Sequence, residues 1–172
     1  LMSYKNVIEK VGVNITNSTA SKNRVNENQE LKGVLDKKKK TEDLFKRLVE
    51  LTIEMARSIN KHSVSGIYTI EPKTNSFMLQ GGKKDEFKES ISIEDKKILN
   101  FVLQSKKIHQ KDNKHLWSNL FSENSWKGSE CAISSPVKIY GNDLGFILCR
   151  IDHFKNISDS DLSSFKNLGE FF

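Results

Sequence analysis

The chain has 172 residues and a formal net charge of +6, a length that favours one domain with extensions over two domains. Hydrophobic residues make up 36% and charged residues 29% of the sequence, so we expect part of the chain to lie outside the packed core. No apolar run reaches the roughly 18 residues of a membrane span, and no signal-peptide pattern opens the sequence. These features favour a cytoplasmic protein. The basic charge permits an acidic partner, but no helix-turn-helix or aromatic-basic pattern supports nucleic-acid binding.

The first forty residues are predicted to form two extensions of the main domain. Residues 1–15 are expected to form a short amphipathic helix that needs a partner surface, because apolar residues recur there at helical spacing. These are Tyr4, Val7, Ile8, Val11 and Ile15. Residues 16–40 are predicted to be a flexible polar linker, since few of their side chains can offset the entropy lost on ordering. The run Lys37 to Lys40 is interpreted as a solvated face, with a phosphate-contacting patch as the alternative.

A strong helical pattern begins at Thr41 and predicts a core-facing helix of about five turns. Glu42 and Asp43 lie at its start, where the helix dipole favours acidic side chains. One apolar stripe consists of Leu44, Leu48, Leu51, Met55 and Ile59, with Phe45, Val49, Ile53 and Ala56 beside it.

The middle of the chain reads as a β-hairpin, a short helix, a brief strand and a long connection. "SVSGIYTIE" and "SFMLQ" alternate around the turn "PKTN", and Ser92 with Asp95 resembles a capping box before the short helix. "KKIHQ" is the brief strand. The connection 112–130 carries Trp117, Phe121 and Trp126, and we expect it to fold over the sheet, because exposing both tryptophans would forgo their burial.

The stretch "SSPVKIYGNDLGFILCRI", residues 134–151, predicts a second hairpin that turns at Gly141-Asn142. Both of its sides are mainly apolar, so we expect a sheet that is covered on both faces. In this register Cys131 and Cys149 point to different faces, which favours two free buried thiols over a disulfide. The four histidines lack ligand spacing, and no metal site is predicted. Ser158 and Asp161 form a capping box before a last amphipathic helix.

The order of these elements resembles that of GAF domains over residues 41–172. The match is best in "ISSPVKIYGNDLGFILCRIDHFKNISDSDLSSFKNLGEFF", whose main fixed points are Pro136, Gly145, Phe154, Asp161 and Leu162. PAS domains, which are a related sandwich, share part of the pattern. The resemblance implies an α+β fold with a central antiparallel sheet of about five to six strands. It places the first and last helices on one face, and a helix and loop cover over a small-molecule pocket on the other.

Functional signatures of several GAF families are missing from the sequence. The Asn-Lys and Glu of cyclic-nucleotide-binding members do not flank Phe154 and Asp161. The free methionine sulfoxide reductases, which are stand-alone GAF enzymes, use closely placed cysteines, whereas Cys131 and Cys149 lie within two predicted strands. We therefore expect no enzyme, with such a reductase as the alternative. No cofactor is predicted, and the identity of a small-molecule ligand stays unknown.

The resemblance leaves two hypotheses for the function. The first is a sensory or regulatory module for signal transduction, which binds a small ligand or acts as a relay and dimerisation unit. Its candidate pocket consists of Tyr68, Trp117, Phe121, Trp126, Ser135 and Arg150. Each of these also has an ordinary structural explanation, such as core packing or an ion pair of Arg150 with Asp152. The alternative is a ligand-free interaction module that binds a protein partner or a second copy through its terminal helices.

Overall fold

The computed structural model describes residues 27–123, 129–152 and 157–171. Six strands form one sheet in the order β3-β2-β1-β6-β5-β4, and every pair is antiparallel. The strands are β1 (Ser63–Glu71), β2 (Ser76–Gly81), β3 (Ser90–Ser92), β4 (Lys107–His109), β5 (Ser129–Ile139) and β6 (Asn142–Asp152). The helices are α2 (Glu27–Ile59), α3 (Lys96–Val102), α4 (Lys114–Leu120) and α5 (Asp159–Lys166), with 3-10 turns η1 (Gln110–Asp112) and η4 (Leu168–Phe171).

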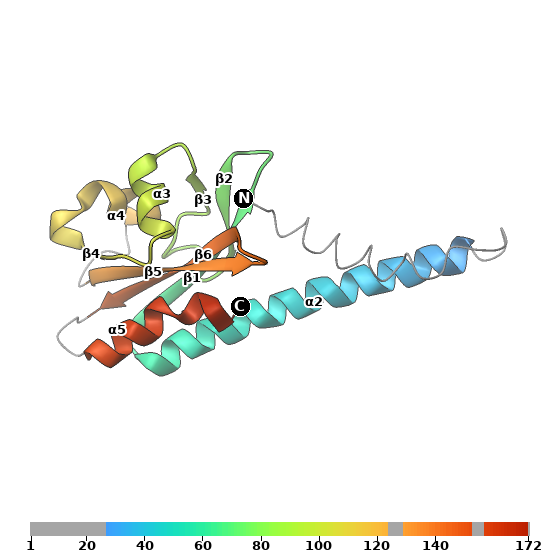
Figure 1. Cartoon of the computed structure of the whole chain (residues 1–172), viewed down its shortest axis with the longest axis horizontal. Coiled ribbons are helices and arrows are strands. Elements are labelled where there is room, and N and C mark those ends of the chain that lie inside the picture. Colours follow the sequence, from blue (N-terminus) through green and yellow to red (C-terminus); the bar gives the residue numbers. More distant parts are fainter. Residues whose placement is uncertain (1–26, 124–128, 153–156, 172) are drawn as a thin grey trace.

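The sheet is covered on both faces, as predicted (Figure 1). Helices α2 and α5 pack on one face, and the shorter α3 and α4 lie over the other. The α2 and α5 face buries a helix-side core of Val49, Ala56, Ile67, Cys131, Ile133, Val137, Leu144, Ile147, Cys149, Ile151, Phe165 and Leu168. The opposite face buries a cover-side core of Tyr68, Ile70, Phe77, Phe87, Ile91, Ile98, Phe101, Val102, Ile108, Trp117, Leu120, Phe121, Ala132, Phe146 and Leu148. The predicted α+β fold class is confirmed.

Helix α2 is much longer than the sequence pattern predicted. It has 33 residues, from Glu27 to Ile59, which corresponds to about 50 Å of helix. Residues 27–40, including the lysine run, are therefore helical, and the prediction of a linker across them was wrong. Lysine is a good helix former, and acid-base pairs four residues apart, such as Asp36 with Lys40, support the helix. The predicted amphipathic helix 1–15 lies outside the described residues.

The buried face of α2 is rotated away from the stripe that the sequence favoured. Val49, Thr52 and Ala56 are buried, whereas Leu44 is 58% exposed and Leu51 is 52% exposed. Thr52 is compatible with burial because its hydroxyl donates to the Leu48 carbonyl at 2.7 Å. Gly81 on β2 lets the helix approach the sheet, since a Cβ there would stand 2.2 Å from Val49 Cγ1.

The β5–β6 hairpin turns one residue earlier than predicted. Tyr140 and Gly141 occupy the turn, with φ of 51° and 76°, which suits a turn that needs positive φ at both central residues. A bulge next to Val137 then adds one residue to β6, so that Pro136 pairs with Phe146. Because side chains alternate along a strand, this one extra residue changes which side chains of β5 and β6 share a face. Cys131 and Cys149 therefore lie on the same face, which corrects the prediction of opposite faces.

The last helix begins as predicted. The Ser158 hydroxyl accepts from the Asp161 amide at 3.1 Å, and the Asp161 carboxylate accepts from the Ser158 amide at 3.4 Å. This capping box satisfies two backbone donors that would otherwise lack a partner at the start of α5. The helix then places Phe165 in the helix-side core.

Candidate functional site

Three of the predicted pocket residues meet in the cover-side core. Tyr68 from β1 stacks on Phe146 with ring centroids 4.9 Å apart, and Trp117 from α4 lies 4.7 Å from Phe121. All four side chains are fully buried. These rings pack against one another between the sheet and α4, where a ligand pocket was predicted. Trp126 lies outside the described residues.

Tyr68 is held in place by its polar end as well as by its ring. Its hydroxyl donates to the Lys88 carbonyl in the connection that follows β2. Burial raises the pKa of Tyr68 far above its usual range. The phenol therefore stays protonated and acts as a fixed donor to the chain that crosses the cover.

Arg150 lies on the cover side of β6 and is paired with two acidic groups. Its side chain is only 3% exposed, and its guanidinium lies 2.7 Å from a Glu86 oxygen and 3.3 Å from an Asp152 oxygen. The guanidinium carbon also lies 5.7 Å from the centre of the Phe121 ring, within the range of a cation–π contact. The ordinary explanation, pairing with Asp152, is what the structure shows. Glu86 was missed because it lies in the charged loop "KKDE", which reads as solvent-exposed.

Ser135 lies on the opposite face of the sheet from Arg150. Its hydroxyl donates to the Lys166 carbonyl at 2.8 Å and accepts from the Gly169 amide at 2.7 Å. It thereby joins β5 to the end of α5 and the start of η4. The neighbouring Ser134 takes the cover side instead and donates to the Phe101 carbonyl at 2.7 Å. The predicted grouping of Ser135 with Arg150 was wrong because it used the hairpin register that the bulge overturns.

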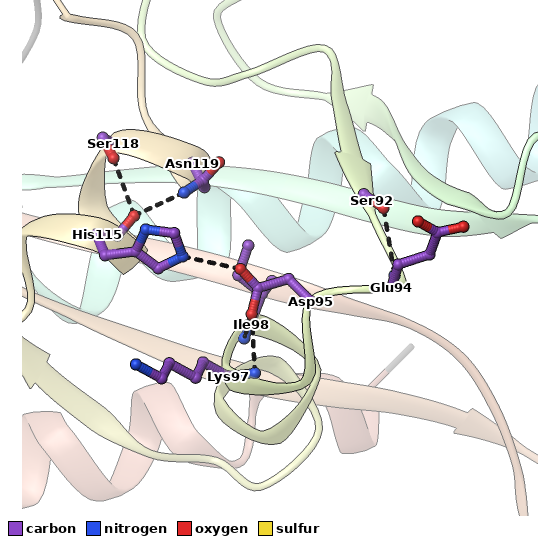
Figure 2. A network of polar contacts seen from close by, with 8 residues as sticks. All are labelled: Ser92, Glu94, Asp95, Lys97, Ile98, His115, Ser118 and Asn119. Atoms are coloured by element: carbon purple, nitrogen blue, oxygen red, sulfur yellow. Dashed lines mark hydrogen bonds and ion pairs between the residues drawn. The ribbon is translucent and has the colours of Figure 1, made fainter.

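A polar contact that the sequence did not reveal joins the two helices of the cover (Figure 2). Asp95 is the N-cap of α3, and its carboxylate accepts from the Lys97 amide at 2.9 Å and the Ile98 amide at 3.3 Å. Its other oxygen lies 2.8 Å from Nε2 of His115 on α4. We refer to the Asp95–His115 contact as the clasp. The hydrogen bond to His115 is the main cause that holds the pKa of Asp95 below its usual value. The hydrogen bonds from the backbone amides lower this pKa further, whereas partial desolvation raises it.

Two of the depressions on the described surface are formed by residues other than the predicted pocket as a whole. A small one of about 110 Å³ lies between α2 and β1, lined by Ile53, Arg57, Ser63, Val64, Ser65, Gly82 and Lys83. A wider one of about 700 Å³ lies on η1 and α4, lined by Gln110, Lys111, Lys114, His115, Trp117 and Ser118. Of the predicted residues it includes only Trp117. The basic stretch "KKIHQKDNKH" was the available signal, but it was interpreted as a strand and a connection.

The two cysteines of the helix-side core are buried and are not joined in a disulfide. Cys131 pairs with Ile151 and Cys149 pairs with Ile133, so the two are diagonal neighbours on adjacent strands. Ser65 on β1 donates to Cys149 Sγ at 3.3 Å. Burial raises the pKa of Cys149 to about 12, so this thiol stays protonated at neutral pH. Within the described part of the chain, no group of His, Cys, Asp or Glu could hold a metal ion, and no helix is long and apolar enough to cross a membrane.

Comparisons with known proteins show similarity of structure and not of sequence. No protein-family model matches the chain, and no curated protein sequence matches it. A type II free methionine-R-sulfoxide reductase from Thermoplasma acidophilum is similar in structure, with a TM-score of 0.55 and 16% identity over 75% of this chain and 92% of that one. The GAF domain of the Acinetobacter phosphoenolpyruvate-protein phosphotransferase gives a TM-score of 0.53 and 12% identity over 76% and 89%.

A third similar structure is a domain of a two-component sensor histidine kinase protein from Sinorhizobium meliloti 1021. Its TM-score is 0.45, with 11% identity over 72% of this chain and 83% of that one. These identities are low, and the comparison is therefore one of backbone architecture.

The likeness to the Thermoplasma protein corrects the expectation that this chain is not an enzyme. A methionine-R-sulfoxide reductase shares the architecture over 92% of its own length, so the architecture gives no ground for excluding catalysis. The activity of that reductase is a property of that protein, because 16% identity shows the fold alone. With its antiparallel sheet between α2 and α5 on one face and α3 and α4 on the other, the chain has the GAF fold that its sequence resembles.

Proposed function

We propose that this GAF-fold domain is a regulatory interaction module that associates with a second copy of the chain through α2. The observation that carries the proposal is a set of apolar side chains on α2 that the domain does not cover. Leu31, Val34, Leu35, Leu44 and Leu51 are all exposed. Scattered exposed leucines are ordinary, but several exposed apolar side chains on one helix are typical of an interaction surface.

The position of α2 supports a role in signal relay. Its C-terminal half packs on β1 and β2, while its N-terminal half extends away from the sheet (Figure 1). Because the helix is continuous from Glu27 to Ile59, a change in the packing of its buried half is carried along the axis to the extended half. The likeness to a GAF domain of a phosphotransferase supports a regulatory role of this kind.

A second copy suits the spacing of the exposed residues. Leu44 and Leu51 are exposed and lie two turns apart on one side of the helix, with the half-buried Leu48 between them at intervals of four and three residues. This is the spacing by which two helices bury a shared apolar seam.

The oligomeric state of the full chain tests the proposal. Sedimentation of the wild-type protein at tens of micromolar is expected to show a dimer, which the double variant Leu44→Glu, Leu51→Glu converts to a monomer with unchanged circular dichroism. Lys46→Glu is the matched control, because it places the same carboxylate on an exposed position of the same helix, on the side away from Leu44 and Leu51. A monomeric wild-type protein, or a dimer that both sets of variants leave intact, contradicts the proposal.

A further inference from the structure

Three exposed side chains in the N-terminal half of α2 continue the side of the helix that is buried in its C-terminal half. We refer to them as the outer patch; they are Leu31, Val34 and Leu35, with exposed fractions of 60%, 45% and 63%. Each precedes a residue of the sheet-facing side by 18 positions, or about five turns. The matching residues are Val49, Thr52 and Ile53, which are buried or half-buried. Because the N-terminal half of α2 extends away from the sheet (Figure 1), the described residues provide no cover for this side there.

The outer patch lies on a different side of α2 from Leu44 and Leu51. At 100° per residue, these two leucines lie about 130° and 150° around the helix axis from the centre of the patch. One partner helix cannot bury both sets, so the patch needs a cover of its own. This cover does not depend on the proposed association through Leu44 and Leu51.

The N-terminal segment of the chain repeats the spacing of the outer patch. Four of its residues are apolar, would share one side of a helix, and are separated by three, one and three positions. They are Tyr4, Val7, Ile8 and Val11. The outer patch together with Lys38 has the same spacing. Because this spacing is the same in both directions along the chain, two antiparallel helices would align the two sets residue by residue.

The lengths of the segments also suit an antiparallel pair. Residues 28–40 of α2 are exposed apart from the half-buried Gly33 and extend for about 20 Å, while a helix of residues 1–15 would extend for about 22 Å. The connection 16–26 has eleven residues, which is more than the roughly two to eight that join packed helices. The connection is therefore long enough for the chain to reverse its direction.

The short connection favours the chain's own N-terminal segment over that of a second copy. A segment on a short tether has an effective concentration of roughly millimolar at its binding surface. This exceeds the concentration of a second copy in a micromolar solution. The outer patch is thus most readily covered from within the same chain.

We propose that residues 1–15 form a helix that packs antiparallel on the outer patch of the same chain. The facing pairs are Val11 with Leu31, Ile8 with Val34, Val7 with Leu35, and Tyr4 with Lys38. The last pair places an amine beside an aromatic ring, which is a favourable contact. The resulting helical hairpin continues the apolar packing of α2 beyond the sheet and leaves Leu44 and Leu51 accessible to a second copy.

A pair of introduced cysteines tests the pairing in the full chain. Ile8→Cys, Val34→Cys is expected to form an intrachain disulfide in a micromolar solution treated with oxidised glutathione, and peptide masses after tryptic digestion identify it. Ile8→Cys, Asp36→Cys is the matched control, because Asp36 lies on the far side of α2 from Val34. The native cysteines are buried and react slowly.

Three results of the cross-linking would overturn the proposal. They are the absence of a disulfide in the first pair, an equal yield in the control pair, and a disulfide between positions 8 and 34 of different chains. The last result would assign the outer patch to a second copy.

Hydrogen exchange provides a measurement without introduced cysteines. In Ile8→Glu, the amides of residues 31–40 should exchange at least about tenfold faster, because a helix that has lost its packing opens more often. Asn6→Glu is the matched control, since it places the same carboxylate on the opposite side of a helix 1–15, and it should leave this exchange unchanged. The amides of β6 report in both variants that the domain stays folded. Equal exchange of residues 31–40 in the two variants would contradict the proposed packing.

Discussion

The two faces of the sheet are stabilised in different ways. The helix-side core is mainly aliphatic and lies under the regular helices α2 and α5, with Phe165 as its buried ring. The cover-side core holds most of the buried rings, and short helices and turns complete it through polar contacts such as the Arg150 ion pairs and the clasp. Regular helices thus cover one face mainly by aliphatic packing, with few polar contacts such as those of Ser135, whereas the irregular cover also contains charged partners.

Removal of Arg150 is expected to have the largest effect, because it breaks the polar part of the cover. Arg150→Leu leaves Glu86 and Asp152 without their cation, and we expect the free energy of unfolding to fall by roughly 2–3 kcal/mol, since both carboxylates can be partly rehydrated. Lys84→Gln removes an exposed pair with Glu89 at 3.4 Å and should change stability by less than about 0.5 kcal/mol. Urea unfolding measures both. Equal stability of the two variants would show that the cover does not depend on the Arg150 pairs.

The two faces are expected to lose stability over different ranges of alkaline pH, because each buries a different weak acid. The folded pKa of Cys149 is raised to about 12, so its thiol stabilises the fold fully below the unfolded pKa of about 8.5 and loses this contribution as pH rises above it. The loss approaches about 1.4 kcal/mol per pH unit. Tyr68 on the cover side acts in the same direction, but only above its unfolded pKa of about 10.

Two variants test this order of events. Cys149→Ala should flatten the fall of stability between pH 8.5 and 10, whereas Tyr68→Phe should leave it unchanged in that range and reduce it above pH 10. Urea unfolding under reducing conditions at a series of pH values provides the measurement. An unchanged slope in Cys149→Ala would show that this thiol is not the group that titrates.

Removal of the clasp is expected to have the smallest effect on stability. Asp95→Ala removes both the N-cap of α3 and the contact to His115, and should lower Tm by about 2–4 °C. Asp95→Asn keeps the cap and should lower Tm by less, as should His115→Gln. Because the folded pKa of Asp95 is lowered, its contribution is present above its unfolded pKa and is lost as pH falls through the folded value.

The carboxyl titration of Asp95 distinguishes the clasp from the cap. In His115→Gln, the pKa of Asp95 should rise towards its usual value, because the hydrogen bond to His115 is the main cause of its lowering. Carbon-13 spectra of the side-chain carboxyl measure this pKa directly. A titration identical to that of the wild type would mean that the two helices are not joined through this contact.

Much of the fold followed from periodicity, while the site depended on contacts between distant parts of the chain. The hairpins, the short helix α3 and the capping box of α5 were predictable from local residue patterns. The early start of α2 was not predictable, because the few apolar residues around the lysine run gave only a weak helical pattern. The clasp joins residues 20 positions apart, and no local pattern reports such a pair.

The candidate pocket was the part that the sequence predicted least well. Trp117, Phe121 and Tyr68 were correctly gathered on one side of the sheet, because large apolar side chains rarely stay in solvent. Their packing against one another could not be derived from spacing. Ser135 was wrongly predicted to share a face with Arg150. Side chains alternate along a strand, so one unpredicted bulge changes which residues of β5 and β6 lie on the same face.

That bulge also determines which insertions and deletions the β5–β6 hairpin can accept. Loss of one residue between Val137 and Gly145 that keeps the bulge would exchange the partners of the two faces, so that either Ser135 would leave η4 or Arg150 would leave Glu86. Loss or gain of two residues would keep every side chain on its own face. Homologous hairpins should therefore differ in length by even numbers, and odd differences should coincide with loss of the bulge.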